Sequence, residues 1–388
     1  MTETRYLLFT DRRFRPLARE EAMSIFPGCR IESYGTQGSV CLITAISEGE
    51  PRTPPSEASF IDFAMRVDAT LENARRDYGR ICAAIREVLE GVPGRSFRLE
   101  VRNIESRIEE SAKDIEVMLG RDLERQGFLA DIKGGEVIVY VVLINDDALV
   151  GHARARAGAA GPLDLLRSEN AETGKVINRA EFKLMEAVDF FGIDLKGVRT
   201  CLDIGAAPGG WTHYLSRNGV RVVARDTALL DYARLSAGKR ILVLVEGPDV
   251  PAAREQVASL APGGNVDVAD IGGPEAGLGD YDIVHLRATM TQERLMQVLG
   301  RFGKFDMLVI DANTSPEDSA RIADEFEPLT RPGSPLVMTV KLVSPSFRRH
   351  IRAVYDGLEK CYGSVRIKKL IHNRMELTAY AVSKGAPA

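Results

Sequence analysis

Short apolar runs alternate with amphipathic stretches along the second half of the chain. The stretch at 178–192 repeats apolar residues at helical spacing, and the apolar run 201–204 that follows is typical of a buried strand. Such alternation favours a mostly parallel α/β sheet with helices on both faces. The same pattern predicts strands at 220–226, 305–312 and 335–343, helices from 209, within 317–327 and at 346–363, and a closing antiparallel edge pair at 365–372 and 376–383.

The first half of the chain mixes predicted strands and helices without regular alternation, which indicates an α+β arrangement. Ser106 and Glu109 form a capping-box pattern, so a helix is predicted over 106–127. The stretch 146–153 predicts a turn and an edge strand. The remaining pattern predicts strands at 5–9, 39–46, 96–104 and 136–145, and helices at 18–26 and in the second half of 61–91.

Two segments rich in small or polar residues, 47–59 and 154–164, divide the chain. A length of 388 residues also suits two or three domains. Glycines and prolines interrupt the pattern around 228–303, where we expect an insertion with one or two strands and two short helices. The resulting division is a domain at 1–59, a second at 60–155, a linker at 156–176 and a third domain at 177–388.

The composition is that of a globular protein, with 45% hydrophobic and 27% charged residues. No apolar run approaches the roughly 18 residues of a membrane span, and the N-terminus lacks a signal-peptide core. The five cysteines form no CxxC pair, which favours a reducing cytoplasm over a disulfide framework. The five histidines are equally scattered, so the sequence gives no support to a metal centre.

Charge is distributed unevenly around a net value of −4. Residues 1–150 carry 20 Lys and Arg against 26 Asp and Glu, whereas residues 331–388 carry 11 against 3. The basic C-terminal segment could track a phosphate backbone, and it could equally be a solvated helix face. Charge alone leaves these two interpretations open.

The stretch LDIGAAPGGWTHYL (202–215) predicts a strand, a glycine-rich turn and a helix. Ligands of open α/β sheets bind at the carboxyl ends of the strands, where this turn would lie. We expect Gly205 to allow a sharp turn, and Gly209 and Gly210 to let a ligand approach the backbone. Pro208 suits the first turn of the helix, where its missing N–H costs nothing.

This turn matches neither GxGxxG nor GxxxxGK[ST], so a dinucleotide or ATP site is disfavoured. Asp226 ends the next predicted strand, 21 residues after Gly205, where an acid suits the two hydroxyls of a ribose. The pattern therefore predicts a nucleoside site without a phosphate clamp, and S-adenosylmethionine fits it best. The alternative is a tight turn whose glycines serve packing alone.

The string DIGAAPGGW resembles motif I of the FtsJ/RrmJ-like RNA ribose 2′-O-methyltransferases, which have a Rossmann-like sheet. That family carries a Lys-Asp-Lys-Glu tetrad, and matching residues follow in order within NRAEFKLMEA, LVIDAN, MTVKLV and HNRMELTAY. The resemblance implies that the catalytic residues are Lys183, Asp311, Lys341 and Glu376. It implies a cofactor site at Asn178, Gly205, Ala207, Pro208, Gly209, Gly210, Trp211, Asp226 and Asp311, and no metal.

The chemistry of the tetrad suits this family. A ribose hydroxyl must lose its proton as it attacks a sulfonium methyl group, and a neutral lysine can take that proton. A free lysine has a pKa of about 10.4, which burial and a second cation lower. By resemblance we assign the activating role to Lys341, the second cation to Lys183, and the orientation of both lysines to Asp311 and Glu376.

The strings APGGWTHYL, HLRA, TVKL and HNRMELT are most similar to the RlmM-like subgroup. That resemblance implies methylation of a cytidine ribose in large-subunit rRNA. It also implies that residues 60–155 form a THUMP-like RNA-binding domain, with a ferredoxin-like domain at 1–59 before it. HLRATM lacks the acid that the family usually places near adenine, so adenine recognition is expected to differ, for example through the backbone.

Several other functions stay open at this point. The same chemistry on tRNA is the nearest alternative, because THUMP domains commonly recognise tRNA. A non-catalytic RNA-binding protein with a methyltransferase fold is opposed by the intact tetrad. An NAD-dependent dehydrogenase would need a second glycine facing the pyrophosphate and a histidine or tyrosine at the hydride site, and neither is evident. The paired lysines disfavour methylation of small molecules or proteins.

Overall fold

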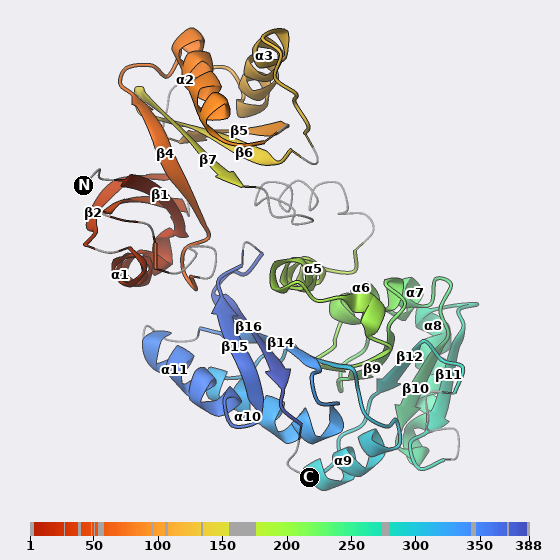
Figure 1. The fold of residues 1–388 in the computed structure, drawn as a ribbon. Coiled ribbons are helices and arrows are strands. Elements are labelled where there is room, and N and C mark those ends of the chain that lie inside the picture. Colours follow the sequence, from red (N-terminus) through yellow and green to blue (C-terminus); the bar gives the residue numbers. More distant parts are fainter. Residues whose placement is uncertain are drawn as a thin grey trace. The chain divides into compact units, whose positions relative to one another are not determined.

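The computed structural model describes residues 4–26, 28–37, 40–47, 49, 51–52, 58–94, 96–104, 108–132, 135–154, 176–273, 279–342, 347–370 and 372–385. The chain divides into two compact units, Met1–Pro162 and Leu163–Ala388 (Figure 1). All but one residue of the predicted linker 156–176 lies outside the described ranges. In the described ranges no helix has the length and apolar character needed to cross a bilayer.

The described part of the first unit is built on one seven-stranded sheet with the order β2-β3-β1-β4-β7-β6-β5. Its strands pair antiparallel except β5 and β6, which are parallel. Figure 1 shows α2 and α3 on one face of this sheet. The strands are β1 (Thr4–Asp11), β2 (Arg30–Gln37), β3 (Val40–Ser47), β4 (Phe63–Leu71), β5 (Phe97–Ile104), β6 (Val137–Ile144) and β7 (Asp147–Arg154). The helices are η1 (Arg12–Phe14), α1 (Arg15–Ile25), α2 (Tyr78–Gly91) and α3 (Ala112–Arg125).

Two predictions for the first unit need correction, and two of its strands were missed. Strand β7 is not an edge strand, because it pairs with both β4 and β6. Helix α3 begins at Ala112, and Ser111 rather than Ser106 caps it by accepting a hydrogen bond from the Asp114 amide; Ser106 itself lies outside the described residues. Strands β2 and β4 were not predicted.

The ranges 1–59 and 60–155, predicted as separate domains, contribute strands to the same sheet. Strand β1 of the first range pairs with β4 of the second over five residue positions, from Arg5 opposite Val67 to Phe9 opposite Phe63. The assignment of these ranges to ferredoxin-like and THUMP-like domains stays a prediction.

The described part of the second unit holds a nine-stranded sheet with the order β11-β10-β12-β9-β8-β13-β14-β16-β15. Its strands are parallel, except that β16 runs antiparallel to both β14 and β15. This arrangement confirms the predicted α/β fold class and its antiparallel edge. The strands are β8 (Thr200–Ile204), β9 (Arg221–Arg225), β10 (Ile241–Val245), β11 (Val266–Asp270), β12 (Ile283–Leu286), β13 (Met307–Ile310), β14 (Pro335–Lys341), β15 (Tyr362–Lys368) and β16 (Glu376–Ser383).

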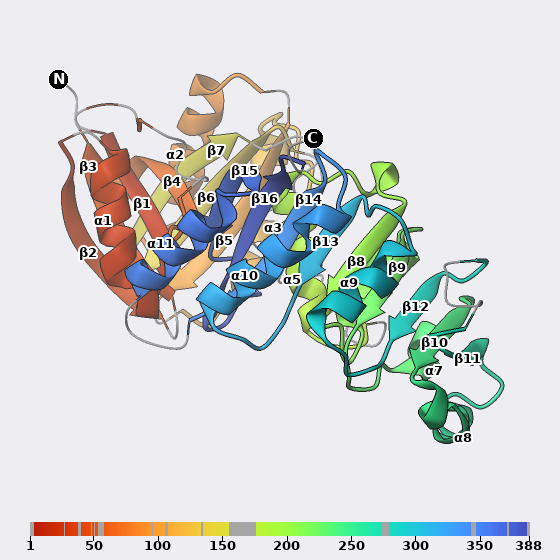
Figure 2. The ribbon, with the colours of Figure 1, turned by 90° about the horizontal axis from the view of Figure 1, so that it is seen from below.

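Helices cover both faces of this sheet, as expected for buried parallel strands. Side chains of α5, α6, α7 and α8 share one apolar core with the strands. Helices α10 and α11 pack side by side near β14 and β15 (Figure 2). The helices are α5 (Ala180–Phe191), η3 (Leu195–Gly197), α6 (Gly210–Arg217), α7 (Tyr232–Leu235), η4 (Gly247–Asp249), α8 (Val250–Leu260), α9 (Gln292–Gly300), α10 (Pro316–Phe326), η5 (Glu327–Leu329) and α11 (Phe347–Leu358).

The stretch 228–303 is more regular than predicted, with the strands β10, β11 and β12 in its described part. Strand β10 does not pair with β9, although it follows β9 in the chain. Strand β12 lies between them and pairs with both, and β11 pairs with β10 at the edge of the sheet. Strand β11 was missed because its sequence, VDVAD, is short and half polar. Strands β10 and β11 therefore extend the sheet on the side away from β14 and β16. That this segment is an insertion stays a prediction.

Candidate active site

Four elements of the second unit bring the predicted tetrad together. Lys183 lies on α5, Asp311 directly follows β13, and Lys341 is the last residue of β14. Glu376 opens β16, and because β16 runs antiparallel to β14, it lies opposite Lys341 in the strand register. The carboxyl ends of parallel strands meet at one sheet edge, so these side chains converge although up to 193 residues separate them.

The four side chains form a closed ring of alternating charge. Glu376 Oε1 lies 2.5 Å from Lys183 Nζ, and Glu376 Oε2 lies 2.9 Å from Lys341 Nζ. Asp311 lies opposite Glu376, with its Oδ2 3.7 Å from Lys183 Nζ and its Oδ1 3.5 Å from Lys341 Nζ. Glu376 is thus the tight bridge between the lysines, whereas Asp311 is held more loosely.

Burial and charge act in opposite directions on the tetrad. Burial raises the pKa of Glu376, but hydrogen bonds from Lys183 and Lys341 outweigh it, so the pKa is lowered overall. Burial lowers the pKa of Lys341, but Asp311 and the hydrogen-bonded Glu376 outweigh it, so the pKa is raised. The expected lowering of the Lys341 pKa is therefore wrong for this arrangement, because two carboxylates face the amine.

Gly205 lies where the turn after β8 meets the end of β13. Its φ of 76° is in the left-handed region, and a Cβ there would lie 2.9 Å from backbone atoms of Asp311 and Ala312. Its amide donates to the Arg225 carbonyl at 3.0 Å. Gly205 therefore lets the turn pack directly against the backbone that carries Asp311.

Gly209 and Gly210 lie against protein atoms rather than open space. A Cβ on Gly209 would lie 3.0 Å from the Leu235 side chain, and one on Gly210 would lie 2.2 Å from Asn178 Oδ1. Asn178 Oδ1 also accepts a hydrogen bond from the Ala180 amide at 3.0 Å. Gly209 and Gly210 therefore also serve the packing of the turn against Leu235 and Asn178.

Helix α6 begins at Gly210 with Gly209 as its N-cap. Pro208 therefore precedes the helix, whereas the sequence predicted it in the first helical turn. Trp211 is buried, and its indole Nε1 donates to the Ala180 carbonyl at 2.7 Å. The Trp211 side chain thus fastens α6 to α5, which carries Lys183.

Asp226 follows β9 and organises the neighbouring loops. Its carboxylate accepts hydrogen bonds from the Ala207 amide at 3.0 Å and the Ala228 amide at 2.9 Å. Each oxygen has a further lone pair that a ribose hydroxyl could use. The residues present therefore fit a nucleoside at this edge of the sheet.

Asp203, on β8, is a buried acid that was not among the predicted site residues. Its Oδ2 accepts a hydrogen bond from Thr212 Oγ1 at 2.6 Å, and its Oδ1 has no hydrogen-bond partner among the described residues. Burial raises the pKa of Asp203 to about 7, although the Thr212 hydroxyl opposes the shift. An aspartate inside the apolar run CLDI was the signal that could have revealed it.

Two buried histidines were also missed. His372, between β15 and β16, donates from its backbone amide to Glu186 Oε2 at 2.9 Å, and its Nδ1 lies 2.8 Å from the same oxygen. His285, on β12, lies 2.7 Å from the Tyr232 hydroxyl and 3.1 Å from the Asp226 carbonyl. Burial lowers the pKa of His285 to about 4, so its ring is neutral and supports Asp226 through one hydrogen bond to the Asp226 carbonyl.

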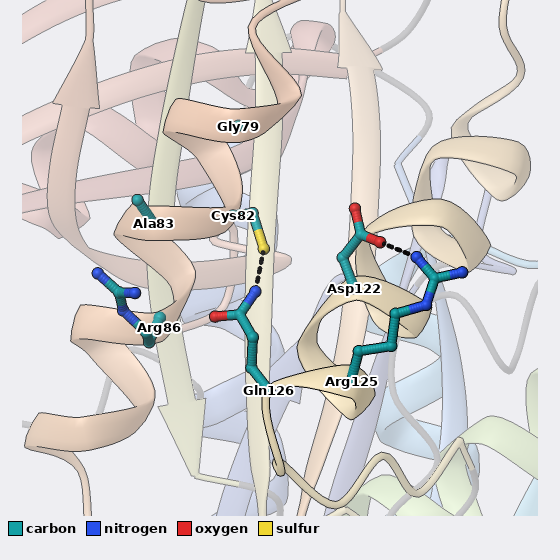
Figure 3. Close-up of a pocket in the computed structure, with 7 residues that line it drawn as sticks. All are labelled: Gly79, Cys82, Ala83, Arg86, Asp122, Arg125 and Gln126. Carbon is teal, nitrogen blue, oxygen red and sulfur yellow. Dashed lines mark hydrogen bonds and ion pairs between the residues drawn. The ribbon is translucent and has the colours of Figure 1, made fainter.

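A separate hollow of about 380 Å³ lies in the first unit between α2 and α3 (Figure 3). Its polar side chains are paired: Arg125 Nη1 lies 2.7 Å from Asp122, Gln126 donates to Cys82 Sγ at 3.5 Å, and Arg86 lies 3.8 Å from Glu90 outside the hollow. Because these groups are already paired, we assign the hollow no part in the chemistry.

Comparison with known proteins agrees with this geometry. The FtsJ-like methyltransferase family model matches residues 176–369, which are 194 of 388 residues. The chain belongs to the FtsJ-like methyltransferase family. The predicted resemblance is thereby confirmed, and S-adenosylmethionine is the cofactor of an FtsJ-like domain.

Two curated relatives illustrate the match. Ribosomal RNA large subunit methyltransferase M of Pseudoalteromonas atlantica is 29% identical over 140 residues, which cover 34% of this chain and 39% of the relative. Ribosomal RNA large subunit methyltransferase E of Halobacterium salinarum is 31% identical over 156 residues, 38% of this chain and 59% of the relative. The chain thus spans about two-fifths to three-fifths of the length of these relatives.

Among solved structures, TrmN from Thermus thermophilus matches over 98% of this chain and 99% of its own, with 14% identity and a TM-score of 0.35. A possible methylase from Clostridium difficile matches over 100% of this chain and 99% of the methylase chain, with 10% identity and a TM-score of 0.32.

Proposed function

We propose that the chain is an S-adenosylmethionine-dependent RNA ribose 2′-O-methyltransferase that acts on a cytidine of large-subunit rRNA. The observation that carries this proposal is the ring of two lysines and two carboxylates at the carboxyl edge of the sheet. It offers a base for a hydroxyl proton beside a nucleoside site. The names of the relatives support rRNA as the substrate.

We assign the cofactor to the edge formed by the turn 205–211, with Asp226 on the ribose hydroxyls and Asn178 and Asp311 at its sides. Bound S-adenosylmethionine supplies an electrophilic methyl group on a sulfonium sulfur. The backbone of the turn, made compact by Gly205, would orient the cofactor next to Asp311. Aligning the acceptor oxygen with the methyl carbon is a large part of the rate that such a site provides.

Lys341 Nζ, in its neutral form, would take the proton of the ribose hydroxyl. Glu376 Oε2 lies 2.9 Å from Lys341 Nζ and Glu376 Oε1 lies 2.5 Å from Lys183 Nζ, so Glu376 holds the two amines side by side. Asp311 lies farther from both amines, which leaves it able to orient the hydroxyl or the cofactor.

The first unit is proposed to bind RNA as a THUMP-like domain preceded by a ferredoxin-like domain. The five cysteines are free thiols, which supports the proposed cytoplasmic location.

Labelling with tritiated S-adenosylmethionine tests the function. Unmodified large-subunit rRNA, small-subunit rRNA and tRNA, transcribed in vitro, are offered to the wild type and to Lys341→Ala. We expect label in large-subunit rRNA at a ribose that then resists alkaline cleavage. For Lys341→Ala we expect a rate at least about 10²-fold lower, since general-base catalysis contributes about 10²–10⁴-fold.

The other outcomes of this experiment are informative. Label in tRNA alone would favour the tRNA alternative, and label on a base would rule out ribose chemistry. Absence of label with retained RNA binding would favour a non-catalytic RNA-binding protein. Lys360, an exposed lysine after α11, is the matched control, and Lys360→Ala should methylate like the wild type.

A further inference from the structure

Helix α11 begins at the same sheet edge as the tetrad. It follows β14, which ends at Lys341, and it packs beside α10, which follows Asp311. The first turns of the two helices are joined, because His350 Nδ1 lies 2.9 Å from Glu317 Oε1. The N-terminal half of α11 therefore lies at the same edge of the sheet as the tetrad.

The exposed face of α11 near this edge is basic. Arg348, Arg349 and Arg352 are all exposed, while Val354 and Leu358 bury the other face of the helix. Arg348 and Arg352 are four residues apart, so they project from one side of the helix. The side chain of Arg352 is 85% exposed, and its contact with Asp356 is a loose one of 3.9 Å.

A fourth arginine reaches the edge from the β15–β16 hairpin. Arg374 is exposed and stands two residues before Glu376. The next residue, Met375, accepts a hydrogen bond through its carbonyl from the Leu342 amide at 2.9 Å, which ties the hairpin to the end of β14. We call Arg348, Arg349, Arg352 and Arg374 the basic rim.

The neighbouring helix α10 has the opposite character. Its surface carries Glu317, Asp318 and Glu325, and its Arg321 is tied to Glu325 at 2.6 Å and to Asp318 at 3.2 Å. A polyanion that reaches the tetrad is therefore attracted over α11 and the hairpin and repelled from α10. The excess of positive charge in residues 331–388, left open by the sequence, is gathered in part on this rim.

We propose that the basic rim binds the phosphates of the RNA strand on one side of the target ribose. The inference rests on the proposed function and deepens it, since it gives the substrate a path into the site. Guanidinium groups bind phosphate oxygens in a fork geometry, and several of them along one face can hold successive phosphates without reading sequence. The rim would thus hold the strand in place while the tetrad acts on the hydroxyl.

The test is the triple variant Arg348→Gln, Arg349→Gln, Arg352→Gln in the full chain. The probe is unmodified large-subunit rRNA transcribed in vitro, with RNA binding and single-turnover methylation measured over a series of salt concentrations. We expect RNA affinity to fall at least tenfold and the salt slope of log K to shrink by about 2, at roughly 0.7 per phosphate contact on a single strand. Affinity for S-adenosylmethionine and the rate at saturating RNA should stay within about twofold of the wild type.

Arg321→Gln on α10 is the matched control, since it removes one arginine that is already paired, and RNA affinity should not fall. Arg374→Gln is a second, independent variant and should weaken RNA binding by itself. Unchanged RNA affinity in the triple variant, with wild-type methylation intact, would overturn the rim and leave the proposed function standing. A wild type that neither binds nor methylates RNA would instead overturn the proposed function. Thermal unfolding of each variant separates lost binding from lost folding.

Discussion

At the residue scale, the state of Lys341 decides how the site works. Two carboxylates raise its pKa above the ordinary value of 10.5. At pH 7.5 the amine is then almost entirely protonated. A lysine that must be neutral to accept a proton is therefore mostly in its inactive form near neutral pH. The neighbouring carboxylates thus hold the amine in position, but they also lower the fraction of it that is neutral.

We predict a rate that rises with pH as a consequence. The single-turnover rate at saturating RNA should increase about tenfold per unit between pH 7.5 and 9.5, because the neutral fraction of Lys341 rises tenfold per unit below its pKa. Rapid-quench assays with labelled cofactor measure this rate. A flat profile, with methyl transfer shown to be rate-limiting, would contradict the role assigned to Lys341.

The variant Glu376→Gln serves as the companion measurement. It removes one of the charges that raise the pKa of Lys341. The rising part of the profile should therefore move to lower pH, while the maximal rate falls because Lys183 and Lys341 lose their bridge. A shift to higher pH would mean that the titrating group is not Lys341.

At the element scale, the tetrad depends on how α5 is fixed to the β15–β16 hairpin. Lys183 is on α5 and Glu376 starts β16, and the buried pair of Glu186 and His372 joins these two elements one helical turn from Lys183. Glu186 accepts from both the backbone and the ring of His372, so it specifies one position of the hairpin. Distances of 2.5–3.7 Å around Lys183 require such a fixed arrangement.

We predict that Glu186→Ala lowers the single-turnover rate at least tenfold and destabilises the fold by about 2–4 kcal/mol, because it leaves the buried His372 without this partner. Affinity for S-adenosylmethionine should change less than twofold, since Asp226 lies on a different element. Single-turnover assays, calorimetric titration and thermal unfolding measure the three quantities.

The control is Glu327→Ala, in η5, which contacts the far end of β16. Glu327 is buried and accepts a hydrogen bond from Ser383, the last residue of β16, at 2.6 Å. This variant should lose stability and keep the rate of the folded protein. Equal loss of rate in both variants would mean that Glu186 supports only stability.

At the scale of the whole molecule, the second unit contains the entire tetrad, the glycine turn and an apolar core of its own. We predict that residues 163–388 produced alone fold cooperatively and bind S-adenosylmethionine as the full chain does. RNA affinity should drop at least tenfold, because the proposed RNA-binding unit is missing. Calorimetry and RNA titration check both statements, and equally efficient RNA methylation by the fragment would count against an RNA-binding first unit.

The pattern of apolar residues predicted most strands of the second unit, because parallel strands that are buried on both faces have nearly continuous apolar sequences. It failed where strands are short or half exposed. Strand β4 was missed because only Met65 of its described side chains is fully buried, and β11 because polar residues interrupt it. The edge position predicted for β7 was wrong because pairing with β4, about 80 residues earlier, leaves no local trace in the sequence.

The sequence by itself determined the α/β class of the second unit and, through motif resemblance, the order of the tetrad and the family. Both are local information, carried by residue periodicity and by short strings. Only the tertiary structure decided that Gly209 and Gly210 pack against Leu235 and Asn178, and that Lys341 faces two carboxylates. These properties arise between residues far apart in the chain, where burial and charge act through space and not along the sequence.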